Sequence, residues 1–216
     1  LTHDLPEKYT EPVAVVDSLG QWMARDWPGK TPTVAEMVSH LQAQQTRYAV
    51  SETPAGRSPF GGWTARQYEA TGFFRLEHDG SRWWLVDPYG YPFLSAGLDC
   101  VRPGISFIST NREELFSYLP TKATPGYEDI VSFHTGRQQT NVNFYVHNLI
   151  RAFGTDWRPP WTTITKGVMQ EAGFNTVANW SDLEFAQTSK LPYVIPLADF
   201  PYTELSLYRD FPDVFD

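Results

Sequence analysis

The sequence has little cysteine, little basic charge and no long apolar run, and each shortage excludes a class of protein. A single cysteine, Cys100, among 216 residues excludes internal disulfides and cysteine-rich metal sites, although it leaves the redox compartment open. A net charge of −8 without a basic stripe argues against a nucleic-acid partner. No apolar run is long enough to span a bilayer, and no signal-peptide pattern opens the chain. Either a signal peptide was removed or none was present.

Aromatic residues are abundant by contrast, at 15% of the chain with eight tryptophans. Such rings usually fill cores or stack on flat ligands, and the core is the commoner place for any single tryptophan.

The stretch from Thr71 to Arg102 carries three β-strand signals in succession. Residues 72–76 and 82–86 flank an Asp-Gly pair, which is typical of a hairpin turn. After a second turn at 87–90, residues 92–98 form a nearly continuous apolar run, which predicts a buried strand ending in Asp99, Cys100 and Arg102. A catalytic barrel presents its working edge in this way, although a β-sandwich corner has the same pattern.

The region before the hairpin predicts an N-terminal part over 1–70. Residues 1–26 show no period and are expected to form an arm lying over another surface. Thr33-Val-Ala-Glu36 has capping-box spacing and opens a one-faced helix over 34–45. Residues 51–63 are a Gly/Pro/Ser loop. Residues 71–216 are then the hairpin and the first part of a barrel.

Between Arg102 and the next strand the sequence predicts helices. Residues 110–113 have capping-box spacing and open a short helix, within a segment that is either a surface excursion or one wall of a substrate cleft. Two longer helices are expected. The first covers 141–153, with Tyr145, Leu149, Ala152 and Phe153 on one face and Gly154 as its C-cap, and the second covers 160–172, with Ile164, Val168 and Met169 inward and Gly173 as its C-cap.

A regular alternation follows. A strand at 174–178, a brief helix capped by Ser181 and a strand at 193–198 have the spacing of a parallel sheet with crossover helices. The fold class is therefore α/β of the barrel type, with the strands at 93–98, 174–178 and 193–198 parallel and adjacent in that order. Pro196 weakens the third strand because a central strand needs that N–H.

Polar or aromatic residues follow each predicted strand at its C-terminal end, where a barrel has its mouth. They are Asp99 and Arg102, then Asn179, Trp180 and Asp182, then Asp199 and Phe200. Carboxylates, amides and an indole suit a sugar, whose hydroxyls need polar partners and whose C–H face packs on a ring. We expect Asn179, Trp180 and Asp99 to face one cavity.

Structural alternatives remain for three of these side chains. Asp99 could pair with Arg102, Asp182 could serve the N-terminus of the following helix, and Trp180 could lie in the core.

Several stretches together resemble glycoside hydrolases of the β-agarase type, with family 50 and its relatives as the nearest match. They are GQWMARDWPGKT, Gly61-Gly-Trp63, ATGFFR, DGSRWWLVDPYGYPFLSAGLDCVR, FNTVANWSD, LPYVIPL and FPDVFD, in the same order from Val15 to Asp216. The resemblance implies a (β/α)8 barrel that hydrolyses β-galactosidic bonds of a polysaccharide, with retention, by two glutamates. It also implies a carbohydrate substrate and a secreted or periplasmic location, and we expect no cofactor and no metal.

In such a barrel the resemblance places the two glutamates after strands four and seven, the first of them following an Asn. No Asn-Glu pair occurs in this chain. The prediction is that the segment is N-terminal, supplies substrate-binding wall without a catalytic residue, is inactive alone, and has the remaining C-terminal part of the barrel as its partner.

Two other functions stay open. A non-catalytic carbohydrate-binding module would need only the aromatic residues and the hairpin, but such modules are usually all-β sandwiches. A metal enzyme using His134 and His147 has less support, because their spacing matches no ligand motif and both are expected on a loop or helix surface.

Overall fold

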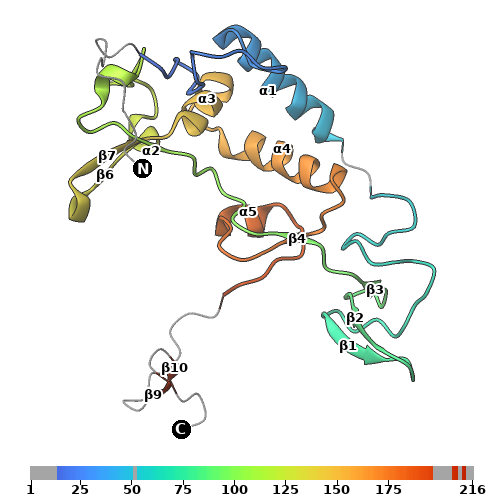
Figure 1. Cartoon of the computed structure of the whole chain (residues 1–216). Coiled ribbons are helices and arrows are strands. Elements are labelled where there is room, and N and C mark those ends of the chain that lie inside the picture. Colours follow the sequence, from blue (N-terminus) through green and yellow to red (C-terminus); the bar gives the residue numbers. More distant parts are fainter. Residues whose placement is uncertain (1–13, 51–52, 197–205, 209–210, 213–216) are drawn as a thin grey trace, which may run out of the picture.

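The computed structural model describes residues 14–50, 53–196, 206–208 and 211–212 (Figure 1). Its α-helices are α1 (Val34–Ala49), α2 (Tyr127–Ile130), α3 (Phe144–Phe153), α4 (Arg158–Glu171) and α5 (Leu183–Thr188). Its strands are β1 (Arg75–His78), β2 (Trp83–Val86), β3 (Pro92–Phe93), β4 (Gly97–Leu98), β5 (Phe107–Ile108), β6 (Val131–His134), β7 (Gln139–Val142), β8 (Thr176–Val177), β9 (Ser206–Tyr208) and β10 (Phe211–Pro212). Short 3-10 helices cover Glu113–Leu115 (η1) and Thr135–Arg137 (η2). None of the described helices is long and apolar enough to cross a membrane.

Helices α1, α3 and α4 form a layer on one side of the molecule (Figure 1). The predicted start of α1 is confirmed, because the Thr33 hydroxyl accepts a hydrogen bond from the N–H of Glu36 at 3.2 Å. The helix runs four residues beyond the predicted 45, to Ala49. Its last turn lies against α4, where Arg47 and Tyr48 both bond to the carboxylate of Glu171.

The core lies between this layer and the short strands. Trp161 and Phe185 are almost fully buried, and their rings lie 5.1 Å apart. Val177 of β8 and Met169 of α4 belong to the same buried cluster. The apolar face of α4 therefore holds β8 in the interior.

The predicted parallel arrangement is confirmed for the described residues. Strand β4 pairs with β8 in parallel, with Gly97 opposite Thr176. A parallel bridge joins Val177 to Tyr193, and the N–H of Val194 donates to the carbonyl of Val177 at 3.0 Å. The third predicted strand is reduced to this bridge, and its last residues, 197–198, lie outside the described residues.

The hairpin is also confirmed, but the apolar run after it is divided. Strands β1, β2 and β3 form an antiparallel sheet in that order. The prediction of one buried strand over 92–98 is wrong, because Pro92–Phe93 pairs with β2 while Gly97–Leu98 pairs with β8. Leu94 between them is 79% exposed. The turn at Asp87, whose N–H donates to Tyr91, folds the first part of the run back onto the hairpin.

The segment from Arg102 to Asn143 holds an antiparallel sheet, in the order β5-β7-β6, that the sequence did not predict (Figure 1). The predicted capping box at 110–113 is wrong. The Thr110 hydroxyl instead accepts from the N–H of Thr140 at 2.8 Å, and only the short η1 follows, without a side-chain cap. Strand β7 likewise takes residues 141–142, so α3 begins at Phe144 with Asn143 as its N-cap.

Further details of the helices differ from the prediction. Gly154 ends α3 as expected, but Tyr145 is 40% exposed, and the buried face of α3 includes Phe144, Val146 and His147. Val168 on α4 is 46% exposed.

The described part of the N-terminal arm, residues 14–26, lies against α3 and η1. The side chain of Asn148 donates to the carbonyl of Leu19 at 2.9 Å, and the N–H of Val16 donates to Leu115 at the same distance. The division of the chain at residue 70 stays a prediction.

Candidate functional site

The C-terminal ends of β4 and β8 are tied together by backbone and side-chain hydrogen bonds. The carboxylate of Asp99 accepts from the N–H of Asn179 at 2.9 Å, and the N–H of Cys100 donates to the Asn179 carbonyl at 2.8 Å. Cys100 and Trp180 both have left-handed backbones, with φ of 57° and 56°. Because such φ values are unfavourable for residues other than glycine, these two contacts hold a tight turn after each strand.

Asn179 and Trp180 present different groups at this place, which we call the strand-end site (Asp99, Asn179 and Trp180). The side-chain oxygen of Asn179 is buried and has no hydrogen-bond partner in the described part of the chain. Trp180 is 64% exposed, so the alternative that it lies in the core is wrong. An amide oxygen can accept from a hydroxyl group, and an exposed indole can pack on the C–H face of a sugar.

Asp182 has structural partners. Its carboxylate accepts from the N–H of Phe185 at 2.8 Å and so caps α5, and it lies 3.3 Å from Arg158. The predicted cap Ser181 is wrong, because its hydroxyl accepts from the N–H of Val101 instead. The alternative role of Asp182 at the helix N-terminus is thus confirmed, while its contact with a substrate stays a prediction.

The other predicted site residues are less closely connected. Arg102 is exposed, and no ion pair joins it to Asp99, although the structure describes both side chains. The proposed loop-fixing pair between them is therefore wrong. Asp199 and Phe200 lie outside the described residues.

The two histidines considered for a metal lie in different surroundings. His134 is exposed and its ring accepts from the N–H of Arg137, whereas His147 is only 3% exposed, which contradicts the expectation of a helix-surface position. Burial, with a smaller contribution from Arg151, lowers the pKa of His147 to about 4. Its ring stacks on Tyr118 with the centroids 5.5 Å apart. Within the described part of the chain, no group of three or more acidic, histidine or cysteine side chains could hold a metal ion.

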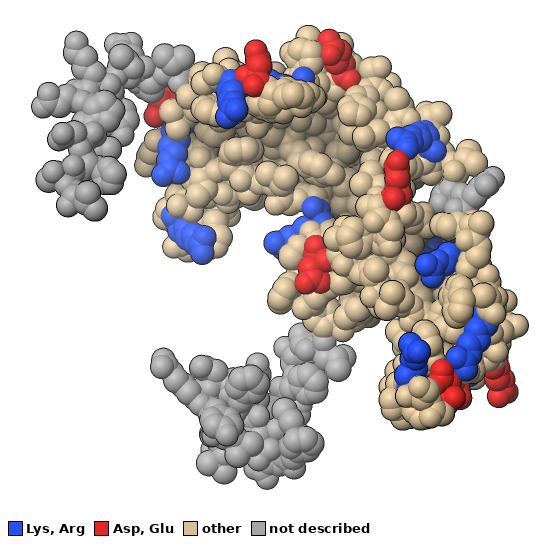
Figure 2. Space-filling view, turned by 45° about the vertical axis from the view of Figure 1, so that its right-hand side comes forward, with Lys and Arg blue, Asp and Glu red and all other residues tan. Residues whose placement is uncertain are grey.

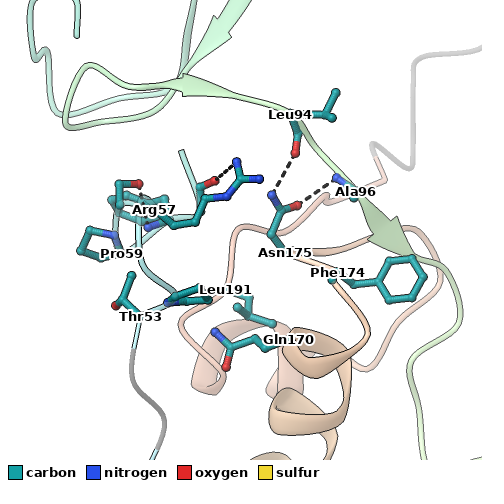
Figure 3. A pocket seen from close by; sticks show the side chains of 14 residues that line it. Thr53, Arg57, Pro59, Leu94, Ala96, Gln170, Phe174, Asn175 and Leu191 are labelled. Carbon is teal, nitrogen blue, oxygen red and sulfur yellow. Dashed lines mark hydrogen bonds between the residues drawn. The ribbon is translucent and has the colours of Figure 1, made fainter. Parts of the chain in front are cut away.

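A hollow of about 280 Å3 lies at the other end of the same strands (Figure 3). Its lining comes from the loop at 53–61, from Leu94 and Ala96, from the segment between Gln170 at the end of α4 and Asn175, and from Leu191. Sequence reasoning missed these residues. One residue could have indicated this region. Asn175 is a polar residue at the start of a mostly apolar predicted strand, and a buried amide there needs hydrogen-bond partners from neighbouring segments.

Charges are dispersed over the surface. Figure 2 shows Lys and Arg side chains interspersed with Asp and Glu on the face that it draws.

No protein-family model matches the chain. Among curated proteins it is 29% identical to β-agarase B of Vibrio sp. (strain JT0107) over an alignment of 208 residues, and the match covers 83% of this chain and 22% of that protein. It is 32% identical to β-agarase A of the same strain over 129 residues, which cover 54% of this chain and 12% of that protein. The chain thus spans about a fifth, or less, of the length of these relatives.

Solved structures give the same result. The agarase AgWH50C matches with a TM-score of 0.72 and 30% identity, covering 84% of this chain and 29% of that one. PfGH50B matches with a TM-score of 0.71 and 27% identity, covering 84% of this chain and 30% of that one. An exo-β-agarase at 23% identity shares the fold with a TM-score of 0.71, and the match covers 84% of this chain and 31% of that one. Over more than four-fifths of its length, the chain resembles one part of the β-agarases of glycoside hydrolase family 50.

Proposed function

We propose that this chain is part of a glycoside hydrolase that acts on agarose or a related β-galactan. The observation that carries the proposal is the parallel pairing of β4 with β8, which brings Asp99 and Asn179 together at the C-terminal ends of the strands. In (β/α)8 barrels substrates bind at that end. The similarity to agarases at about 30% identity supplies the substrate class.

The proposed architecture is a (β/α)8 barrel of which this chain holds an N-terminal arm and the first three strands. Support comes from the parallel order β4, β8 and Tyr193, with helices α4 and α5 in the intervening chain. The agarases that match are three to eight times longer than the matched segment, which leaves room for further strands in the complete protein.

The proposed role of the strand-end site is to form one wall of the substrate cleft. Asn179 would accept a hydrogen bond from a sugar hydroxyl, Trp180 would pack on a sugar face, and Asp99 would hold the turn on which both lie. Arg102, Asp182 and Asp199 are proposed as further substrate contacts from the same edge.

The catalytic pair is proposed to come from other parts of the barrel. A retaining mechanism needs two carboxyl groups about 5–5.5 Å apart. Glu171 is bonded to Arg47 and Tyr48 of α1, and Glu184 of α5 is paired with Arg158 of α4, so both carboxylates are engaged in helix packing. We propose a secreted or periplasmic location, because a polysaccharide substrate is met outside the cell.

A non-catalytic carbohydrate-binding module is the less favoured function. Such modules are usually antiparallel sandwiches, whereas β4 and β8 are parallel and α3 and α4 supply much of the core.

The test is hydrolysis of agarose oligosaccharides by the full-length protein, followed by proton NMR of the first product formed. We expect turnover with the β-anomer formed first, which indicates retention. The 216-residue chain alone should give no turnover. Turnover by the isolated chain that is lost on mutation of one of its own carboxylates would contradict the placement of the catalytic pair, and inactivity of the full-length protein on every β-galactan would contradict the substrate class.

A further inference from the structure

The hollow at the N-terminal ends of β4 and β8 has fixed walls. Asn175 uses both polar atoms of its amide, because its oxygen accepts from the N–H of Ala96 at 2.9 Å and its nitrogen donates to the carbonyl of Leu94 at 2.9 Å (Figure 3). Gly61, at φ of 92°, lies so close that a Cβ there would come within 3.1 Å of Asn175. The loop and the strand ends therefore meet in a defined contact.

The loop at 53–61 is held in place by buried hydrogen bonds and a ring contact. The hydroxyl of Ser58, only 3% exposed, bonds to the fully buried carboxylate of Asp87. The same hydroxyl accepts from the N–H of Gly62 at 2.9 Å. Phe60 next to it packs against Tyr89 with the ring centroids 5.4 Å apart. These contacts give the hollow a persistent shape, as ligand pockets generally have.

The lining of the hollow is mostly apolar, with a single charge. Phe60, Phe174 and Leu191 contribute apolar surface, and Leu94 is 79% exposed beside them. Of the described residues that line the hollow, Arg57 alone is charged. Among the described residues its guanidinium makes one long contact, 3.4 Å, to the carbonyl of Gly61, and none of their carboxylates lies within ion-pair distance of it.

We propose that this hollow binds a small carboxylate with an apolar body. A guanidinium with no ion-pair partner among the described residues offers a forked pair of donors that match a carboxylate, and the apolar walls favour a ring or a short chain over a sugar. A volume of about 280 Å3 is at the small end of the range for ligand sites. This site lies at the opposite ends of the strands from Asp99 and Asn179, so it is separate from the proposed substrate cleft.

The test is a calorimetric titration of the full-length protein with benzoate, acetate and benzyl alcohol. Benzoate carries both the charge and the apolar body, acetate lacks the body, and benzyl alcohol lacks the charge. We expect saturable benzoate binding with a Kd of about 1 mM or tighter, and about tenfold weaker binding of the other two probes.

Variants assign the binding to Arg57. Arg57→Gln should weaken benzoate binding about tenfold and leave benzyl alcohol unchanged, since it removes only the charge-assisted bonds. Arg57→Lys, which keeps the charge without the fork, should lie between wild type and Arg57→Gln. Arg137→Gln removes another exposed charge, away from the hollow, and serves as the matched control. Hydrolysis of agarose oligosaccharides should be the same in all four proteins.

The proposal is overturned if benzoate does not saturate. It is equally overturned if Arg57→Gln binds benzoate as wild type does, or if benzyl alcohol binds as tightly as benzoate. Filling of the hollow by another part of the complete protein would give the first of these results.

Discussion

Asp99 and Asn179, which are 80 positions apart in the chain, are joined by a hydrogen bond of 2.9 Å from the backbone N–H of Asn179 to the Asp99 carboxylate. The return contact from the N–H of Cys100 to the Asn179 carbonyl makes the link reciprocal. Through this link the end of one strand sets the conformation of the other. The orientation of Asn179 and Trp180 therefore depends on Asp99, which follows β4.

Two replacements of Asp99 distinguish its role in holding the turn by a hydrogen bond from a role of its negative charge. Asp99→Ala removes the acceptor and should lower kcat/KM on agarose oligosaccharides while costing about 1 kcal/mol of unfolding free energy, because water can reach the exposed N–H. Asp99→Asn keeps an oxygen acceptor and should retain most of both. If Asp99→Asn loses as much activity as Asp99→Ala while remaining as stable as wild type, the carboxylate acts on substrate directly and its part in holding the turn is secondary.

The strand-end residues could be predicted because their signal is local. The apolar run at 174–178 lies directly after an amphipathic helix, and in a parallel sheet the polar residues that follow such a strand share one edge with those that follow its neighbours. That reasoning placed Asn179 beside Asp99 from sequence alone. Asp182 follows the same strand a few residues later, yet its carboxylate caps α5, a choice that only the three-dimensional turn decides.

The sheet formed by β5, β7 and β6 could not be predicted in the same way. Its strands are short, and Gln139–Val142 reads as a polar approach to a helix rather than as a strand. The pairing of β5 with β7 places Phe107 opposite Val142, which is distant in sequence. Because strands depend on such distant partners, no local sequence pattern predicts them. The hollow around Asn175 was missed for a related reason, because its walls come from segments that meet only in the folded chain.

Trp180 should contribute to substrate use through its exposed ring. Trp180→Ala should lower kcat/KM on agarose oligosaccharides by an amount equal to about 1–3 kcal/mol, the value of burying an aromatic side chain against a ligand. Trp83→Ala is the matched control, since Trp83 is 67% exposed against 64% for Trp180 but lies in the hairpin sheet. Equal kcat/KM for Trp180→Ala and wild type would remove Trp180 from the cleft.

His147 should make the free energy of unfolding depend on pH between the pKa of its imidazole in the folded chain and the pKa in the unfolded chain. Burial lowers the pKa of its imidazole to about 4, below the 6.5 of the unfolded chain. The stability that follows from a neutral buried ring is therefore complete above pH 6.5 and is lost as pH falls toward 4. By linkage the loss is at most about 3 kcal/mol.

Urea unfolding from pH 7 to pH 4 measures this loss. His147→Phe keeps a ring to stack on Tyr118 and should reduce the slope of unfolding free energy with pH. His40→Phe replaces an exposed histidine on α1 and is the matched control. Identical slopes for wild type and His147→Phe would show that the imidazole of His147 has the same pKa in the folded and the unfolded chain, which contradicts the lowered pKa.

Gly167 lets α4 approach α1 closely, and that approach supports the strand that carries the strand-end site. A Cβ at this position would overlap the side chain of Tyr48 on α1. In an open helix, glycine to alanine stabilises by about 1 kcal/mol. Here the overlap should dominate, and Gly167→Ala should lower the free energy of unfolding by about 1–3 kcal/mol, the usual cost of overpacking.

A double-mutant cycle with Tyr48→Ala isolates the contact. Tyr48→Ala removes the ring atoms that the new methyl group would overlap but keeps the Cβ of residue 48, 2.6 Å away. Gly167→Ala should therefore cost less in the Tyr48→Ala background than with Tyr48 present, and the two changes should couple by more than about 1 kcal/mol. Urea unfolding of the four proteins supplies the measurement. Because α4 leads directly into β8, the destabilised Gly167→Ala protein should also lose activity at lower urea than wild type does. Stabilisation by Gly167→Ala with Tyr48 present would mean that α1 and α4 are not packed as closely as this contact requires.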